Sequence, residues 1–414
     1  RYQREVMKET KDSPELLAKD IFRAGENKND PVLVKMVGEK AGGVVDWLIY
    51  DLKIPYGPAA TQYPDHSANR QLGVTGRSVN WLKLMSQKLN ENGGKIMTDT
   101  RAQEFIRDKA GNVVGVKATM TNGQKIDFSA KSVVLASGGY GANRAMLPKK
   151  VASYLFYGLD SETGDGLAMG KKIGAGTINL DLVKQYPQGV ETLPHHALAA
   201  TASSTNTMKK SGAIYVNRDG KRIVDELAGL GTLTKITEAQ KDSIMYIVMD
   251  KAAWKQYVAK SLEDKLVAAP SDLDKWAKIV NNGYPVMATS AKLADAAKTM
   301  GINAKGLQAT IARWNGFVKA GADKDFGRKV LMPFGEGPYY IVEQKPRFQT
   351  TLGGLKANAD MQILNKKGQP IGNLFGAGCV VGGANGSDSL TAMMNSWAII
   401  SGVVAGDSAV KNLK

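Results

Sequence analysis

Cysteine is nearly absent from this sequence, and histidine is scarce. The 414 residues include a single cysteine, Cys379, and three histidines, His66, His195 and His196. One cysteine excludes an internal disulfide and any CxxC metal or iron–sulfur motif, and the histidines show no ligand spacing. We therefore expect no metal site.

Long apolar runs are also missing, although the chain carries a formal net charge of +16. No stretch of eighteen apolar residues and no signal peptide is visible, so we expect no membrane span. The lysines are spread out, and no basic block is interleaved with aromatics, which argues against nucleic-acid binding. The charge fits a solvated surface, an acidic redox partner or an anionic envelope surface. We expect a periplasmic or envelope location rather than a cytoplasmic one.

Glycine, by contrast, is abundant, with 45 residues. The most informative stretch is 373–390, which indicates a short apolar strand, a glycine-rich turn and a long helix that begins near Ser389. Glycines allow a ligand to approach the backbone closely, and the free N–H groups of a helix N-terminus favour negative charge. The pattern is typical of a cofactor seat, although such loops occur in many folds.

The first half of the chain changes from helical to strand patterns. Asp30-Pro31 predicts a capped helix start, and residues 76–92 predict a second helix. Residues 113–120 and 124–128 predict two strands joined at the turn Asn122-Gly123. A buried strand over 132–136 then leads into Ser137-Gly138-Gly139.

Further along, Thr163-Gly-Asp-Gly166 precedes a helix that Thr163 or Asp165 could cap. Asp219-Gly220 predicts a hairpin between strands at 214–216 and 222–224. Residues 250–319 indicate mostly surface helices, and Asn303 is a plausible cap for one of them.

In order and spacing, these landmarks resemble the flavoprotein subunit of the fumarate reductase/succinate dehydrogenase superfamily, and soluble flavocytochrome-type fumarate reductases in particular. The segments that carry the resemblance are 16–52, 133–141, 163–169, 212–226, 311–327, 337–340, 351–354 and 374–383. The resemblance implies a mixed α/β (α+β) fold in which an FAD-binding flavin domain is interrupted by a mobile capping domain. It places the flavin domain at 1–181 and 351–414, and the cap at 182–350.

One departure from that family concerns the start of the chain. The family opens with a βαβ unit whose Gly-x-Gly-x-x-Gly turn holds the FAD pyrophosphate, and no such turn opens this sequence. We expect residue 1 to fall after that unit, so that the chain is a fragment or has lost its dinucleotide seat.

A second departure concerns the groups that clamp a dicarboxylate in the family. The His-Pro pair corresponds to Tyr186-Pro187, the Thr/Ser-Glu pair to Thr205-Asn206, the proton-donating arginine to Leu230, the paired histidines to Gln349-Thr350, the loop arginine to Ser389 and the loop glutamate to Cys379. A dicarboxylate needs two cationic anchors in a dry cleft. Their loss argues against fumarate as the substrate.

The candidate site residues follow from this comparison. For catalysis or substrate contact we predict Tyr186, Thr205, Asn206, Gln349, Ser389 and Arg70. For FAD contact, the resemblance implies Ala136, Ser137, Gly138, Gly139, Thr163, Gly164, Asp165, Thr350, Gly378, Cys379, Ser389, Leu390, Thr391 and Asn395. Simpler roles compete with these: Tyr186 as a packing aromatic, Ser389 as a helix cap, Arg70 as a surface arginine and Cys379 as a small buried residue.

Two functional hypotheses remain. The first is an FAD-dependent oxidoreductase that exchanges hydride with an activated C=C/CH–CH pair of a small molecule less anionic than fumarate: an enoate, an aromatic enoate or a ketosteroid-like enone. Its electron donor would be a protein or module, and the positive charge favours an acidic heme or flavin carrier. The second is a catalytically silent flavoprotein or binding homologue, or a fragment of such an enzyme, that has kept the fold.

Overall fold

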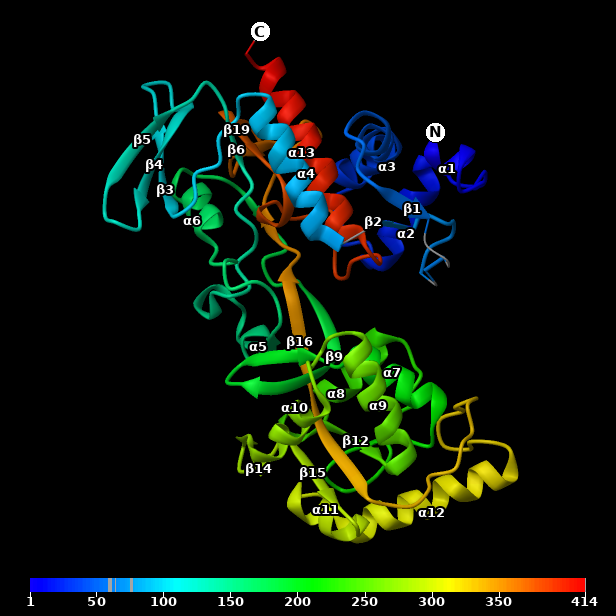
Figure 1. The fold of residues 1–414 in the computed structure, drawn as a ribbon. Helices are drawn as coiled ribbons and strands as arrows, with labels where there is room; N and C mark the ends of the chain where they lie inside the picture. Colours follow the sequence, from blue (N-terminus) through cyan, green and yellow to red (C-terminus); the bar gives the residue numbers. More distant parts are fainter. Residues whose placement is uncertain (59–61, 64, 75–76, 414) are drawn as a thin grey trace. The chain divides into compact units, whose positions relative to one another are not determined.

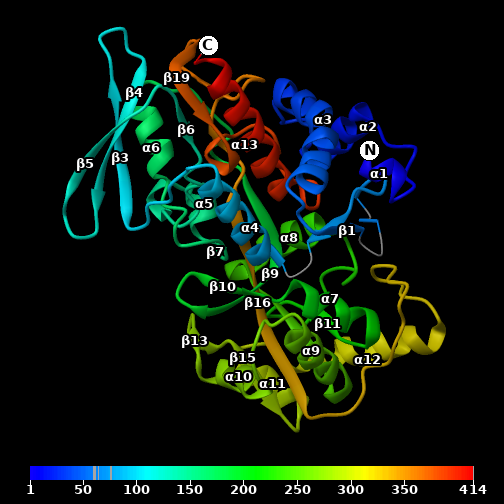
Figure 2. The same ribbon diagram turned by 45° about the horizontal axis from the view of Figure 1, so that its top comes forward.

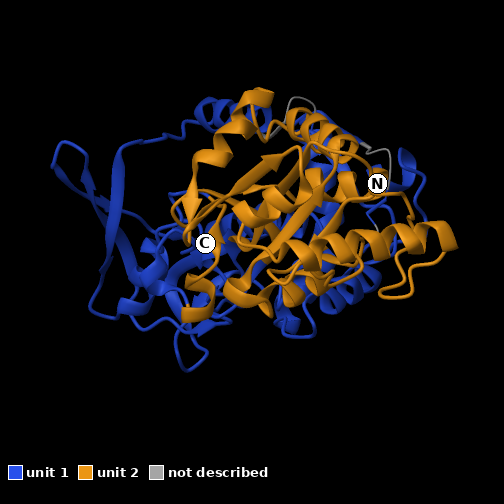
Figure 3. Ribbon diagram, turned by 90° about the horizontal axis from the view of Figure 1, so that it is seen from below, with its two compact units in different colours: residues 1–147, 159–184, 350–414 blue, residues 148–158, 185–349 orange. Residues whose placement is uncertain are grey.

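The computed structural model describes residues 1–58, 62–63, 65–74 and 77–413, and this part of the chain divides into two compact units (Figure 3). Unit 1 comprises residues 1–147, 159–184 and 350–414, and unit 2 comprises residues 148–158 and 185–349. Both units combine helices with sheets, as the mixed α/β fold class predicted. The cap function predicted for 182–350 stays a prediction.

Unit 1 contains the helices and strands of the first third of the chain together with those of its end (Figure 1). Its helices are α1 (Tyr2–Glu5), α2 (Pro14–Ala24), α3 (Pro31–Asp46), the π-helical turn η1 (Trp47–Asp51), α4 (Arg77–Glu91), the 3-10 turn η2 (Arg144–Met146), α6 (Asp165–Lys172), the 3-10 turn η5 (Gly378–Val380) and α13 (Met393–Lys411). Its strands are β1 (Tyr56–Pro58), β2 (Leu72–Val74), β3 (Thr100–Arg107), β4 (Val113–Met120), β5 (Lys125–Ser129), β6 (Val133–Leu135), β8 (Thr177–Ile178), β17 (Gly354–Leu355), β18 (Gln362–Leu364) and β19 (Pro370–Gly376).

The pairing of β6 with β19 organises unit 1. The two short strands run parallel in the sheet order β18-β19-β6, with Leu374 opposite Val133 and Gly376 opposite Leu135. Helix α13 lies beside both strands (Figure 2). Because the strands are parallel, the loops that follow them leave the sheet at the same edge.

Several local predictions are confirmed in unit 1. The Asp30 side chain accepts a hydrogen bond from the Val32 amide at the start of α3. Strand β4 has the predicted bounds, and the turn at Asn122-Gly123 joins it to β5, where Gly123 has a left-handed φ of 86° that glycine adopts readily. Helix α4 occupies the predicted segment, of which Gly76 lies outside the described residues.

Two predicted caps in unit 1 are wrong. Helix α6 has Gly164 at its N-cap, with φ of 78° and no side-chain cap, because the Asp165 carboxylate is held by Arg101 instead. The last helix begins at Met393 rather than near Ser389, after Ala392 in a left-handed conformation. The Ser389 hydroxyl lies 2.9 Å from Asn385 Oδ1 and 3.1 Å from the Leu390 carbonyl, so it serves the loop and not the helix.

Unit 2 contains most of the middle of the chain. Its helices are α5 (Lys149–Ala152), α7 (Thr201–Lys210), α8 (Leu230–Glu238), the 3-10 turn η3 (Lys241–Ser243), α9 (Lys251–Glu263), α10 (Pro270–Asp274), the 3-10 turn η4 (Lys275–Lys278), α11 (Leu293–Thr299) and α12 (Ala304–Ala320). Its strands are β7 (Leu155–Phe156), β9 (Val183–Leu193), β10 (His196–Ala199), β11 (Ile214–Val216), β12 (Met245–Met249), β13 (Val280–Asn281), β14 (Tyr284–Pro285), β15 (Met287–Ser290) and β16 (Tyr339–Thr351). Within the described ranges of both units, no helix is long and apolar enough to cross a bilayer.

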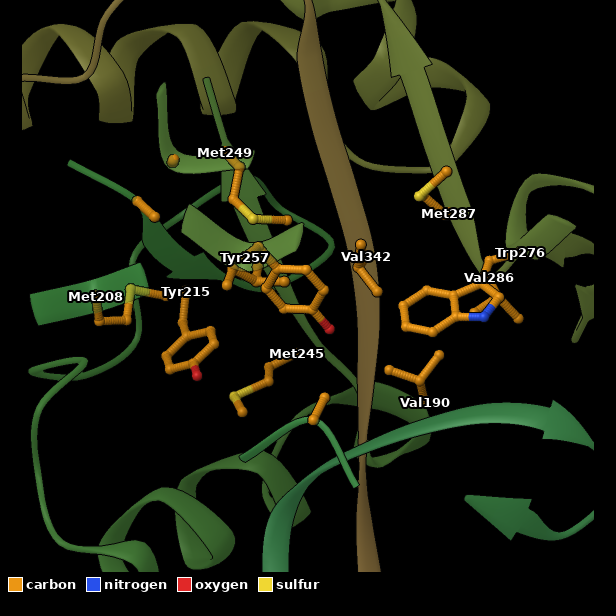
Figure 4. Packing of buried hydrophobic residues seen from close by; sticks show 14 of the residues in the cluster. Val190, Met208, Tyr215, Met245, Met249, Tyr257, Trp276, Val286, Met287 and Val342 are labelled. Carbon is orange, nitrogen blue, oxygen red and sulfur yellow. The ribbon is translucent and has the colours of Figure 1, made fainter. Parts of the chain in front are cut away.

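A seven-stranded sheet forms the centre of unit 2. Its order is β11-β12-β16-β7-β10-β9, with β15 added to β16 and a further pairing between β16 and β9. One face packs against α7, α9 and α10 through a buried cluster that includes Tyr215, Met245, Tyr257, Trp276 and Val342 (Figure 4). The long strand β16 therefore crosses the middle of the sheet and is buried along most of its length.

As predicted, Asn303 caps a helix, α12, by accepting a hydrogen bond from the Gly306 amide.

A buried ion network replaces the second half of the hairpin predicted at 214–224. Only an isolated bridge joins Val216 to Arg222, so residues 222–224 form no strand. The Arg222 guanidinium instead donates to Glu226 at 2.8 and 2.9 Å and to Asp323 at 3.1 Å, while Arg328 donates to Glu226 at 3.2 Å. All four side chains are buried, and their charges compensate one another.

Candidate functional site

The predicted flavin-contacting loops meet at the edge of the β6–β19 pair. Residues 136–139 follow β6, and residues 377–379 follow β19. Gly138 and Gly378 have left-handed φ values of 75° and 67°, which are strained for other residues. Without side chains at these glycines the backbone of both loops is open to close approach by a ligand, and the cofactor seat stays a prediction.

The start of α6 packs against the loop that follows β6. The Gly164 amide donates to the Gly139 carbonyl at 3.1 Å. A Cβ atom at Gly166 would lie 2.0 Å from Ser137 Oγ, so glycine is required for the approach of α6. The structure thus brings together the predicted groups Ser137–Gly139 and Thr163–Asp165.

Asp165 itself is engaged in a bidentate ion pair. Its carboxylate accepts hydrogen bonds from Arg101 Nε at 2.6 Å and Nη2 at 2.8 Å, and these bonds hold the pKa of Asp165 below its usual range. Both of its oxygens already have a strong partner, so a flavin contact would come from the backbone around it.

Sequence reasoning missed Glu162, which lies at the centre of this group. Its Oε1 accepts a hydrogen bond from the Thr350 hydroxyl at 3.1 Å, while its Oε2 is buried and has no hydrogen-bond partner in the described part of the chain. Burial raises the pKa of Glu162 to about 7, and the Thr350 hydroxyl and the Gly141 backbone only partly offset that rise. A buried carboxyl with one unused oxygen can exchange a proton near neutral pH.

Cys379 belongs to the same cluster. Its thiol interacts with the Thr350 hydroxyl, and burial raises the pKa of the thiol. A raised pKa keeps the thiol protonated and unreactive, so the simpler interpretation as a small buried residue fits better than a redox role.

A cavity of about 510 Å³ lies elsewhere in unit 1. Most of the side chains that line it are apolar, and many of these come from α3, α4 and α13. The predicted residues Arg70, Leu390, Thr391 and Asn395 also line it, so the structure brings these four together. The volume and the apolar wall are typical of a small-molecule site.

Arg70 is not available as an anion anchor in this cavity. Its guanidinium donates to Asp12 at 2.6 and 2.9 Å and to Asp20 at 2.6 Å. Burial would raise the pKa of Asp20, but hydrogen bonds from Ser67 and Arg70 outweigh it and hold the pKa at about 2. The positive charge of Arg70 is neutralised, which does not favour the predicted catalytic role.

The remaining predicted residues lie in unit 2. Tyr186 is on β9 and Gln349 on β16, two strands that pair with each other. Thr205 and Asn206 lie in the middle of α7. The Tyr186 ring covers the guanidinium of Arg347, which the sequence analysis also missed because a lone arginine carries no motif.

Comparisons with known proteins identify the class to which this architecture belongs. Residues 2–393 match the FAD binding domain family, so the chain belongs to this family. It is a flavoprotein of the fumarate reductase/succinate dehydrogenase superfamily, with FAD as its cofactor, as the sequence resemblance predicted.

The similar proteins are named for different substrates. A urocanate reductase of Eggerthella lenta is 32% identical over 407 residues, which cover 96% of this chain and 64% of the relative. The open conformation of a flavocytochrome c3 fumarate reductase has a TM-score of 0.79 at 25% identity and covers 99% of this chain and 69% of that one. A 3-ketosteroid Δ1-dehydrogenase from Sterolibacterium denitrificans shares the fold, with a TM-score of 0.78 at 17% identity over 97% of this chain and 89% of that one. The chain thus spans less than two thirds of the urocanate reductase.

The residues at the edge of the β6–β19 pair fit the flavin ring of FAD. The left-handed glycines 138 and 378 and the unpartnered Glu162 Oε2 form a polar, open edge suited to a ring with hydrogen-bonding atoms. No Gly-x-Gly-x-x-Gly turn for a pyrophosphate occurs in the sequence. Residues 137–139, 350 and 378–379 would therefore hold the flavin part of the cofactor. When bound, FAD supplies hydride-transfer chemistry.

Proposed function

We propose that this chain is the substrate-converting part of an FAD-dependent oxidoreductase that reduces an activated C=C bond, or forms one, in a substrate other than fumarate. Reduction adds a hydride and a proton across the double bond, and an electron donor supplies the two electrons. The relatives named for urocanate and fumarate reduction support this class of reaction. The net charge favours an acidic carrier as the electron donor. This donor and the envelope location remain predictions.

The observation that carries the proposal is the loss of cations at the family's anchor positions. Tyr186, Leu230, Gln349, Thr350 and Ser389 are all uncharged. Arg70, the predicted cation of the cavity in unit 1, is neutralised by Asp12 and Asp20. A substrate with two carboxylates would therefore lack the pair of cationic anchors that these positions supply in the family. Polar side chains at Tyr186, Gln349 and Ser389 indicate a respecified site rather than a decayed one.

The test is reduction of a substrate panel by the full-length flavoprotein with FAD bound and reduced methyl viologen as donor. The panel holds urocanate, cinnamate, a 3-ketosteroid enone and fumarate. We expect kcat/KM for at least one of the first three to exceed that for fumarate by about tenfold or more, which corresponds to the loss of one good anchoring interaction.

Two outcomes contradict the proposal. Fumarate as the best substrate would show that the missing cations are replaced by groups elsewhere. No turnover of any panel member by protein with a full complement of FAD would support the catalytically silent flavoprotein instead.

A further inference from the structure

Arg347 places a guanidinium inside unit 2. The residue is only 3% exposed and lies on β16. The Tyr157 ring covers it with its centroid 4.5 Å from Arg347 Cζ, and the Tyr186 ring does so at 4.3 Å. These contacts fix the guanidinium in place through cation–π attraction but leave its charge uncompensated.

The hydrogen bonds of Arg347 are incomplete. Nε donates to the Gln188 carbonyl at 3.0 Å, and Nη2 donates to Thr201 Oγ1 at 3.0 Å. Nη1 is buried and has no hydrogen-bond partner among the residues that the structure describes. Burial lowers the pKa of Arg347 to about 10, so the group still carries its charge at neutral pH.

Other buried cations of unit 2 form ion pairs with carboxylates. Arg222 pairs with Glu226 and Asp323, Arg328 with Glu226, and Lys345 with Glu191 and Glu343. In the described chain Arg347 has no such carboxylate partner. A buried charge without a counter-ion is expensive, so its retention needs an anion that binds there.

The surroundings of Arg347 carry two of the predicted site residues. Tyr186 stacks on it, and Gln349 lies two positions along β16, where strand alternation places it on the same face as Arg347. Tyr157, whose ring lies over the guanidinium, is 41% exposed, and Gln349 is also exposed, so the contacts of Arg347 reach the surface of unit 2. Rotation of the exposed Tyr157 ring would uncover one face of the guanidinium.

We propose that Arg347 anchors the carboxylate of the substrate, and that the substrate class is an α,β-unsaturated monocarboxylate. This assignment rests on the proposed function, whose substrate it narrows. One guanidinium, with Nη1 unused, matches one carboxylate, while the neighbouring Tyr157, Tyr186 and Gln349 offer no second charge. Arg347 is thus a binding residue that sets specificity.

The test compares two substrates that differ in charge and little in shape, cinnamate and cinnamamide, with the FAD-loaded full-length protein. We expect the wild type to prefer the acid by about 10²-fold in kcat/KM, mainly through KM, because a buried charge pair gains that much over a neutral contact. Arg347→Gln should abolish the preference by lowering kcat/KM for the acid to the level of the amide. Arg347→Lys, which keeps the charge without the planar fork, should retain part of the preference.

Arg218 offers a matched control. It also lies over two tyrosine rings, Tyr246 at 5.7 Å and Tyr284 at 4.6 Å, but it has Asp242 as a counter-ion at 3.6 Å. Arg218→Gln should leave the preference for the acid unchanged. A loss of preference in both variants would point to a general loss of charge and would overturn the proposal.

A binding measurement separates this proposal from the proposed function. The dissociation constants of 3-phenylpropanoate and its amide, measured by calorimetry, should differ in the wild type and converge in Arg347→Gln. Turnover of both substrates without preference for the acid refutes the anchor and leaves the reductase function standing. If neither cinnamate nor cinnamamide is turned over, the rest of the substrate panel decides the reductase function, and the calorimetry alone decides the anchor: equal affinities for acid and amide refute it.

Discussion

Glu162 should make the stability of unit 1 fall as the pH rises. Its carboxyl has a pKa of about 7 in the folded protein, against 4.5 for an ordinary glutamate. Between these two values the folded chain binds a proton that the unfolded chain has released, so the free energy of unfolding declines as pH rises from about 4.5 to about 7. Above a pH of about 7 the free energy of unfolding declines no further on account of Glu162.

The size of this effect follows from the shift. Each pKa unit corresponds to about 1.4 kcal/mol, which gives about 3 kcal/mol at most for Glu162. Partial solvent exposure of the side chain reduces the expected value to about 2 kcal/mol. Glu162→Gln keeps the shape and the hydrogen bond with Thr350, carries no charge at any pH, and should remove this decline.

The assay is urea unfolding of the wild type and Glu162→Gln at pH 5 and pH 8, followed by hydrogen exchange of amides in 133–141 and 374–380. Glu104→Gln is the control, because Glu104 is an exposed carboxylate of the same unit whose pKa is lowered by Lys172. The free energy of unfolding of Glu104→Gln should decline between pH 5 and pH 8 as much as that of the wild type. An equal decline in wild type and Glu162→Gln would refute the assignment of a protonated, buried Glu162.

The remaining predictions concern unit 2. Glu226→Gln should lower the stability of this unit by about 3–5 kcal/mol in thermal unfolding, because Arg222 and Arg328 lose a buried carboxylate; a change no larger than that of Asp325→Asn, in an exposed pair, would contradict this. Tyr186→Phe keeps the ring over Arg347 and removes the hydroxyl, so it should lower kcat by about 10²-fold with KM nearly unchanged if the phenol delivers the proton. Tyr340→Phe should leave kcat unaltered, and equal effects in both variants would exclude a proton-donating role for Tyr186.

Local sequence signals predicted much of the fold correctly. The Asp30-Pro31 start of α3, the bounds of β4 and the Asn303 cap of α12 depend on residues within one turn or one hairpin. The cap expected at Ser389 failed because Asn385, in the same loop, engages its hydroxyl, and Ala392 instead adopts the left-handed conformation before α13. Propensity alone does not predict a left-handed alanine.

The site was predictable only where a family pattern could be transferred. Tyr186 and Gln349 were predicted from their positions in that pattern, and the loops at 136–139 and 377–379 from their glycines; their roles stay predictions. Glu162 and Arg347 had no such signal. Their properties come from burial and from partners distant in sequence, such as Thr350 for Glu162 and Gln188 for Arg347.

The parallel pairing of β6 with β19 sets the order in which the protein can be built during synthesis. More than half of the chain separates Val133 from Leu374, its partner. When residue 349 has left the ribosome, every segment of unit 2 is present, whereas the strand that completes the sheet of unit 1 has yet to be made. The unit that carries Arg347 can therefore fold first, and the glycine loops after β6 and β19 come together only once residue 379 has left the ribosome.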